Sequence, residues 1–239
     1  MSGNITVMFS ITRNLYDKAP GVIYNLIKTN PEVWRIYLFI EDDDFPYPLD
    51  KRVRVININH FPKYIEGGPN EGNAWTHMAY TRCFVSQLLL EDKIIYLDLD
   101  LYFYNKLDRL WNIDFEGNYV CGVSEDNATL RRRERYINTG VLLLNLRAMH
   151  RDHIDYDICK LIQTRKLQFP DQDAINEVCK GKIKFIHHNF NYSSNTLQTE
   201  TENIPLTIVH TIGVKLWDKR SKLYKNWQEN TNKALGINN

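Results

Sequence analysis

The 239-residue chain has few cysteines, no long apolar run and no excess of charge of one sign. Its four cysteines are far apart and form no Cys-x-x-Cys pair, which weighs against a zinc site and favours reduced thiols. Thirty basic residues balance 29 acidic ones, so no overall field favours nucleic acid or an anionic membrane as a partner. No apolar stretch reaches the ~18 residues that cross a bilayer.

The N-terminal stretch MSGNITVMFSITRN lacks the basic start and the long apolar core of a signal peptide. We therefore expect a cytoplasmic protein, with peripheral attachment at the inner face of the membrane left open. No Gly/Ser-rich linker divides the chain. We predict a single domain over residues 1–217, followed by a helical tail over 218–239.

Apolar runs rich in β-forming residues alternate with segments of helical periodicity. This alternation predicts an α/β fold with a mostly parallel central sheet flanked by helices, and its N-terminal half resembles a nucleotide-binding βαβ unit. Ligands of such sheets gather at the carboxyl ends of the strands. We expect strands over 5–12, 34–41, 52–59, 93–105, 118–125, 136–146, 183–187 and 206–210, and helices over 20–31, 74–90, 148–166 and from 170 onward.

The run KIIYLDLDLYFYN, residues 93–105, is an apolar strand that carries two carboxylates, Asp98 and Asp100. In a continuous strand, alternation places both on one face and Leu99 on the opposite, apolar face. Burial and like charge would both raise the pKa values of the two carboxyl groups, and a divalent cation between them removes that conflict. Oxygen ligands suit Mg²⁺ and Mn²⁺, which take further oxygens from a substrate phosphate. Two ordinary acids on a solvated strand face would give the same short motif.

Four segments, in this order, resemble glycosyltransferase family 8, the group that contains glycogenin and bacterial lipooligosaccharide galactosyltransferases. The resemblance extends over roughly residues 5–217 and implies a GT-A fold. It implies a metal-dependent, retaining enzyme that moves a hexose, glucose or galactose, from a nucleotide sugar, usually the UDP form, to a glycan, lipid-linked or protein acceptor. The segments are IIYLDLDLYFYNKLDRLW, YINTGVLLLNLRAMHR, PDQDAIN and HTIGVKLW.

The same resemblance implies roles for individual residues. Asp98, Asp100 and His210 match the ligands that hold Mn²⁺, or Mg²⁺ in its place, on the donor diphosphate. Asp171 and Gln172 match residues at the reacting sugar, and because Gln172 is not a carboxylate, a same-face displacement is favoured over a double displacement. The positions that match nucleotide-sugar contacts are Thr12, Asn14, Arg82, Leu99, Asp126, Asn138, Thr139, Gly140, Gly213 and Lys215.

Two segments depart from the family pattern. Thr12 stands where the family carries an acid that reads uracil, and the aromatic residue that stacks on the base corresponds to Leu15 or Tyr16, depending on the alignment. The loop after His210 is one residue shorter than usual and places Leu216, not proline, after its lysine. These departures leave the donor base open. They also keep a second hypothesis, a catalytically weak nucleotide-sugar-binding protein.

Overall fold

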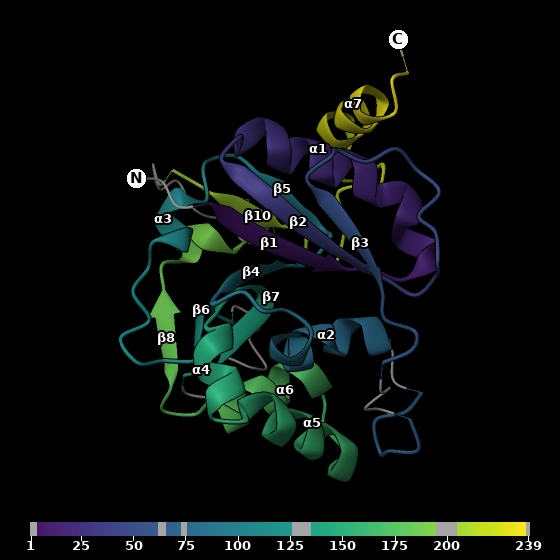
Figure 1. The fold of residues 1–239 in the computed structure, drawn as a ribbon. Coiled ribbons are helices and arrows are strands. Elements are labelled where there is room, and N and C mark those ends of the chain that lie inside the picture. The colour runs from purple at the N-terminus through teal and green to yellow at the C-terminus, as the bar shows by residue number, and fades with distance from the viewer. Residues whose placement is uncertain (1–3, 62–65, 73–75, 126–134, 195–204, 238–239) are drawn as a thin grey trace.

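The computed structural model describes residues 4–61, 66–72, 76–125, 135–194 and 205–237 (Figure 1). Within these residues, the largest sheet has seven strands in the order β3-β2-β1-β4-β7-β6-β8. Neighbouring strands are parallel except where they pair with β7, so the expected mostly parallel sheet is confirmed. The strands are β1 (Ile5–Ser10), β2 (Val33–Ile40), β3 (Val53–Asn57), β4 (Ile94–Leu97), β6 (Val120–Ser124), β7 (Ile137–Leu144) and β8 (Ile183–Ile186).

The N-terminal half begins with the expected βαβ unit. A 3₁₀ turn (Arg13–Lys18) leads from β1 into helix α1 (Ala19–Thr29), and β2 then lies parallel to β1. Pro20 is in the first turn of α1, where its missing N–H has no helical partner to lose.

Helices cover both faces of the sheet, and the apolar core lies on both sides of it (Figure 1). In β4, Ile95 and Leu97 belong to one core cluster while Ile94 and Tyr96 belong to the other, as expected for a strand buried on both faces. No described helix combines the length and the apolarity needed to span a membrane. Besides α1, the helices are α2 (Thr81–Phe84), α3 (Asp108–Trp111), α4 (Leu146–Arg151), α5 (Ile154–Thr164), α6 (Pro170–Val178) and α7 (Tyr224–Ala234).

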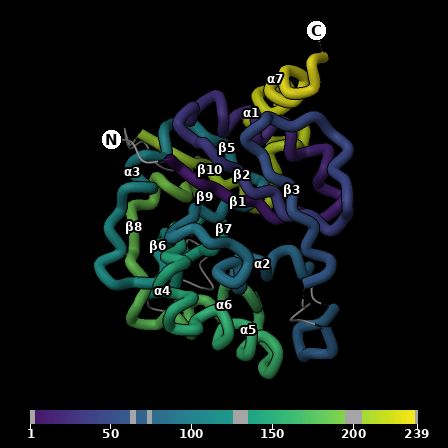
Figure 2. Tube along the Cα trace, viewed as in Figure 1, coloured from purple at the N-terminus to yellow at the C-terminus, as the bar shows by residue number. Residues whose placement is uncertain are grey.

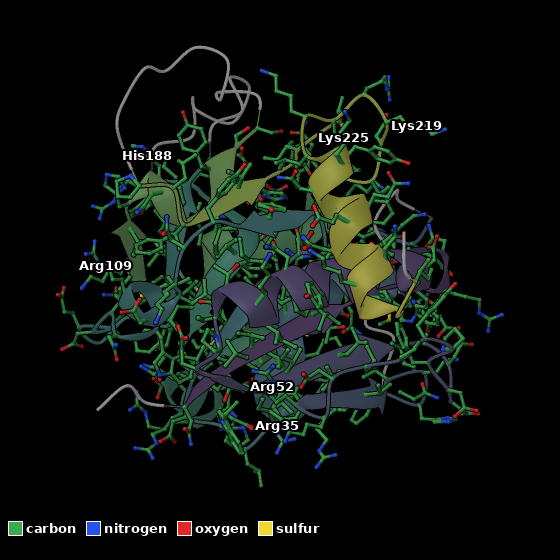
Figure 3. The ribbon with its side chains drawn as sticks, turned by 90° about the horizontal axis from the view of Figure 1, so that it is seen from above. Arg35, Arg52, Arg109, His188, Lys219 and Lys225 are labelled. Atoms are coloured by element: carbon green, nitrogen blue, oxygen red, sulfur yellow. The ribbon has the colours of Figure 1, made fainter. Side chains whose placement is uncertain are left out.

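The C-terminal tail forms α7, which packs across α1 (Figures 2 and 3). Gly21 makes this contact close: a Cβ there would lie 2.1 Å from Oγ1 of Thr231 and 3.0 Å from Nε1 of Trp227. That same indole nitrogen donates a hydrogen bond to the carbonyl of Lys18 at 3.3 Å. The tail is thus packed against the βαβ unit and its 3₁₀ turn.

A second, three-stranded sheet corrects the prediction of one continuous strand over 93–105. Strand β4 ends at Leu97, and the chain then crosses into this sheet as β5 (Leu101–Phe103), which pairs antiparallel with β10 (Ile208–His210). Strand β9 (Tyr192–Ser193) lies parallel to β10 on its other side. The two aspartates therefore occupy the crossing between two sheets. The apolar alternation continues through the crossing, which is why it predicted a single strand.

Two predicted helices are also divided. The helix expected over 74–90 is wrong as a continuous α-helix: α2 is flanked by 3₁₀ turns at His77–Tyr80 and Val85–Gln87. The helix expected over 148–166 is split into α4 and α5 at His153, whose φ of 55° is left-handed and cannot continue an α-helix.

Candidate active site

Asp98, Asp100 and His210 meet where the two sheets join. One ligand atom from each lies within 4.8 Å of the others. Nε2 of His210 is 3.2 Å from Oδ1 of Asp100 and 3.8 Å from Oδ2 of Asp98. The pairing of β10 with β5 produces this arrangement, because it sets His210 opposite Leu101 and lets the N–H of Thr211 donate to the Asp100 carbonyl at 2.9 Å. Asp98 and Asp100 thus both face His210, although they do not belong to one continuous strand.

Gly140 on β7 provides the space for this cluster. Its carbonyl accepts a hydrogen bond from the N–H of Asp98 at 2.8 Å, so the two backbones are in direct contact. A Cβ at Gly140 would lie 2.3 Å from Cε1 of His210 and 2.9 Å from Oδ2 of Asp98. Two carboxylates and an imidazole around this space are a donor set that suits Mn²⁺ or Mg²⁺. The residues present therefore fit a divalent cation.

The electrostatics of the cluster are dominated by its acids. Burial opposes ionisation of Asp100, but His210 and Lys215 outweigh it and hold the pKa of this carboxyl well below its usual range. Burial lowers the pKa of His210, whereas Asp100 and Asp98 raise it, and the net shift is upward. Nζ of Lys215 lies 2.5 Å from Oδ2 of Asp100. Two basic side chains, His210 and Lys215, therefore contact the carboxylate of Asp100.

Arg82 lies buried behind the cluster, between Asp98 and Asp171. Its Nη2 donates to Asp98 at 2.9 Å, and its Nε is 3.4 Å from the Asp171 carboxylate. Nη1 donates to the carbonyl of Thr139 at 2.6 Å, and the guanidinium stacks 4.1 Å from the centre of the Tyr96 ring. Burial raises the pKa of Asp171, while the nearby Arg82 lowers it, and burial prevails. The guanidinium is thus held by protein groups and fixes the positions of two site carboxylates.

The amides of Asn138 and Gln172 converge on one carboxylate, Glu125. Its Oε2 accepts from Nδ2 of Asn138 at 2.9 Å and from Nε2 of Gln172 at 3.0 Å. Thr139 completes the group, because its backbone N–H donates to Oε1 of Gln172 at 3.0 Å. Sequence reasoning selected the next acid along the chain, Asp126, which lies outside the described residues. The only signal for Glu125 was its place at the end of an apolar strand.

Asn191 connects these amides to His210. Its Oδ1 is 3.0 Å from Nδ1 of His210, and its Nδ2 donates to Oδ1 of Asn138 at 2.8 Å. Sequence reasoning missed this residue, which lies between a 3₁₀ turn (His188–Phe190) and the short strand β9, where no recognised motif stands.

The predicted base-binding segment lies at the carboxyl end of β1. Thr12 is half-buried, Asn14 is exposed, and the Thr12 hydroxyl donates to the Asn14 side-chain oxygen. Tyr16 is buried, with its ring 5.2 Å from that of Phe45 and its hydroxyl accepting from the backbone N–H of Glu41. The Tyr16 ring therefore belongs to the core, and the half-buried Leu15 lies nearer the surface.

The remaining predicted positions surround the cluster or lie beneath it. Leu99, between the aspartates, is buried in the apolar core. Gly213 has a φ of 87° in the loop after β10, a left-handed conformation that favours glycine and turns the chain toward Lys215.

The fold is of the GT-A type, as a comparison with solved structures shows. A solved structure of the galactosyltransferase LgtC with donor and acceptor sugar analogues matches with a TM-score of 0.80 and 19% identity, covering 96% of each chain. An active-site LgtC mutant with glutamate in place of glutamine matches with a TM-score of 0.77, at the same identity and coverage.

The profile of Glycosyl transferase family 8 matches residues 7–221, and the chain belongs to this family. Lipopolysaccharide glucosyltransferase WaaO of Escherichia coli K12 is 25% identical over 210 residues, covering 75% of this chain and 61% of that protein. Glycosyltransferase GlyF of Streptococcus pneumoniae is 25% identical over 175 residues, covering 68% of this chain and 44% of that protein. The chain spans about half the length of the curated relatives it matches.

Replacing Gly140 by alanine should weaken cation binding without unfolding the domain. The added methyl group would displace His210 or Asp98, and we expect the affinity for Mn²⁺ to fall more than about 10-fold. Electron paramagnetic resonance measures the concentration of free Mn²⁺ and therefore gives this affinity directly. Gly117→Ala is the control: no neighbour lies within 4 Å of a Cβ there, and its left-handed φ of 78° makes the change cost stability away from the site. Unchanged binding by Gly140→Ala would show that the cation is held elsewhere.

Binding of Mn²⁺ should weaken as the pH falls. A proton on Nε2 of His210 competes with the cation, and because the pKa of His210 is raised, this competition begins at a higher pH than for a free histidine. Asp100, with its lowered pKa, stays ionised over the same range. The apparent affinity should fall by about tenfold per pH unit below the His210 pKa. A flat profile between pH 5 and 8 would contradict His210 as a ligand.

Proposed function

We propose that the protein is a metal-dependent, retaining hexosyltransferase that takes glucose or galactose from a nucleotide sugar, the UDP form first among them. The observation that carries the proposal is the cluster of Asp98, which is half-buried, with the buried Asp100 and His210, beside the amides of Asn138 and Gln172. Acids and imidazole suit a cation that bridges to a diphosphate, and the neighbouring amides suit the hydroxyls of a sugar. Membership of family 8 supports this combination.

In the proposed reaction, the bond between the anomeric carbon and the diphosphate oxygen breaks as the acceptor oxygen bonds to the same face of the sugar. The acceptor proton passes to the departing phosphate oxygen, so the configuration is retained without an enzyme nucleophile. A bound Mn²⁺ would neutralise charge on the leaving diphosphate. Among the described residues, the side chain of Lys215, which is 44% exposed and next to Asp100, is a cation placed to contact the phosphates.

Asp171 and Gln172 open helix α6 beside the cluster, and the proposal assigns them to the reacting sugar. Asp171 is held by Arg82 and by the hydroxyl of Thr139, which donates to it at 3.3 Å. Arg82 then acts through the carboxylates it orients. Thr12 and Asn14 would border the base, where the core position of Tyr16 leaves a contact different from the stacking usual in the family.

The acceptor is proposed as a glycan, lipid-linked or protein group. A cytoplasmic location, with or without contact to the inner face of the membrane, belongs to the same proposal and agrees with four buried free cysteines. In Figure 3, Lys219 and Lys225 lie on one side of the molecule, whereas Arg109 lies on another, so these labelled residues do not form one basic surface for nucleic acid.

Incubation with UDP-glucose or UDP-galactose and Mn²⁺ should release UDP even without an acceptor, and a chelator should stop the release. We expect Asp100→Asn to lower kcat/KM more than about 100-fold, because it removes a cation ligand and the charge that Lys215 faces. Asp152→Asn is the matched control, since this carboxylate pairs with Arg151 at the end of α4, outside the site. With an acceptor, proton NMR should show that the product keeps the anomeric configuration of the donor.

Three outcomes would count against the proposal. An inverted product would overturn the retaining reaction. Release of UDP that persists in Asp100→Asn would overturn the cation site. A donor that raises the melting temperature in the presence of Mn²⁺ but is never turned over would support the weak nucleotide-sugar-binding protein instead.

A further inference from the structure

We propose that Glu125 is a positioning residue that orients the two halves of the site together. One oxygen of its carboxylate orients Gln172 toward the donor sugar and, through Asn138 and Asn191, sets which nitrogen of His210 carries a proton. The role of Gln172 toward the sugar rests on the proposed function. The effect on His210 concerns cation binding alone.

Glu125 is held firmly at the carboxyl end of β6. It is 8% exposed, and its backbone N–H donates to the carbonyl of Tyr136 at 3.0 Å, which extends the pairing of β6 with β7. An ionised carboxylate only accepts hydrogen bonds, so any amide beside it must present its NH₂ group. Glu125 therefore imposes a direction on its neighbours.

The orientation of Gln172 is fixed from both ends. The backbone N–H of Thr139 can only donate, so the amide oxygen Oε1 must face it, at 3.0 Å. The NH₂ group then faces Oε2 of Glu125 at 3.0 Å. An amide NH₂ has two hydrogens, and within the described part of the chain only one of them has a partner, so the second can donate to a hydroxyl of the sugar. Gln172 thus acts toward the sugar as a hydrogen-bond donor of fixed direction.

The side-chain amide of Asn138 is also oriented by Glu125, and it in turn orients Asn191 beside the cation site. The backbone N–H of Gly140 donates to its Oδ1 at 2.9 Å, and its Nδ2 donates to Glu125, so this amide is also fixed from both ends. Oδ1 accepts a second bond from Nδ2 of Asn191, which leaves the Asn191 oxygen facing Nδ1 of His210 at 3.0 Å. An acceptor at that place requires the proton on Nδ1.

In the neutral imidazole, a proton on Nδ1 leaves the lone pair of Nε2 facing Asp98 and Asp100, which is the form of histidine that binds a cation. Partners that hold a ligand histidine in this way typically change metal affinity or activity by about 10- to 100-fold. Here the hydrogen-bond chain runs in one direction, from His210 to Asn191, Asn138 and finally Glu125. A single carboxylate then serves both cation binding and sugar binding.

The test compares Glu125→Leu with Glu125→Gln. Leucine removes the acceptor, and we expect affinity for Mn²⁺, measured without nucleotide by electron paramagnetic resonance, to fall about 10- to 100-fold. Glutamine keeps an acceptor oxygen for both amides, and we expect its Mn²⁺ affinity to stay within about threefold of the native value. In turnover assays, Glu125→Leu should raise the donor KM, and Glu125→Gln should restore most of it.

Asp155→Leu is the matched control, because it removes an equally buried carboxylate, paired with the Ser86 hydroxyl outside the site. Native Mn²⁺ affinity in folded Glu125→Leu would overturn the proposal, as would an equal loss in Glu125→Gln. If Glu125→Leu does not fold, Asn191→Leu interrupts the same chain, and its affinity should fall by a similar factor; native affinity there is equally contradictory. Absence of turnover in the native protein would overturn the proposed function while leaving the Mn²⁺ comparison decisive.

Discussion

The mutual repulsion of Asp98 and Asp100 is the constraint around which the site is organised. Two carboxylates at the junction of two sheets, one of them buried, would oppose folding if nothing balanced their charge. The chain places cations on two sides, Arg82 beneath Asp98 and Lys215 beside Asp100, and the imidazole of His210 lies between the two aspartates. The space kept open by the missing side chain of Gly140 adds room for a further cation.

The arrangement of the two sheets determines where the two aspartates lie. Strand β4 ends just before Asp98 in the large sheet, and β5 begins just after Asp100 in the small one, so the two acids lie at the junction of the sheets. Pairing of β10 with β5 then determines which residue faces them, and a shift of one residue would turn the His210 side chain away. The geometry of the candidate cation site and the fold therefore depend on the same few backbone contacts.

Local pattern in the sequence was sufficient for much of the large sheet. Strands such as β1 and β7 are buried on both faces and have near-continuous apolar runs, and their predicted ranges agree with the structure within a few residues. The resemblance to a family connected His210 to the aspartates more than 100 residues away, which no local pattern could do. The two-residue motif alone did not separate a cation site from two surface acids.

Features set by pairing between distant segments could not be predicted. The crossing at Asp98 preserves the apolar alternation on both sides, so only the change of partner from β7 to β10 reveals it. Glu125 and Asn191 carry no recognisable motif, because their roles depend on which amide ends they face. Tyr16 in the core, where an aromatic contact to the base was one alternative, depends on its packing against Phe45.

The central claim is that Asp98, Asp100 and His210 hold a cation against the diphosphate of a nucleotide sugar. Electron paramagnetic resonance of protein-bound Mn²⁺ tests it most directly, when UDP with ¹⁷O in its β-phosphate is compared with unlabelled UDP. We predict broader Mn²⁺ lines with the labelled nucleotide, because the nuclear spin of a directly bonded oxygen couples to the metal. Identical spectra from a saturated complex would show that the cation does not contact the diphosphate, and would contradict the account.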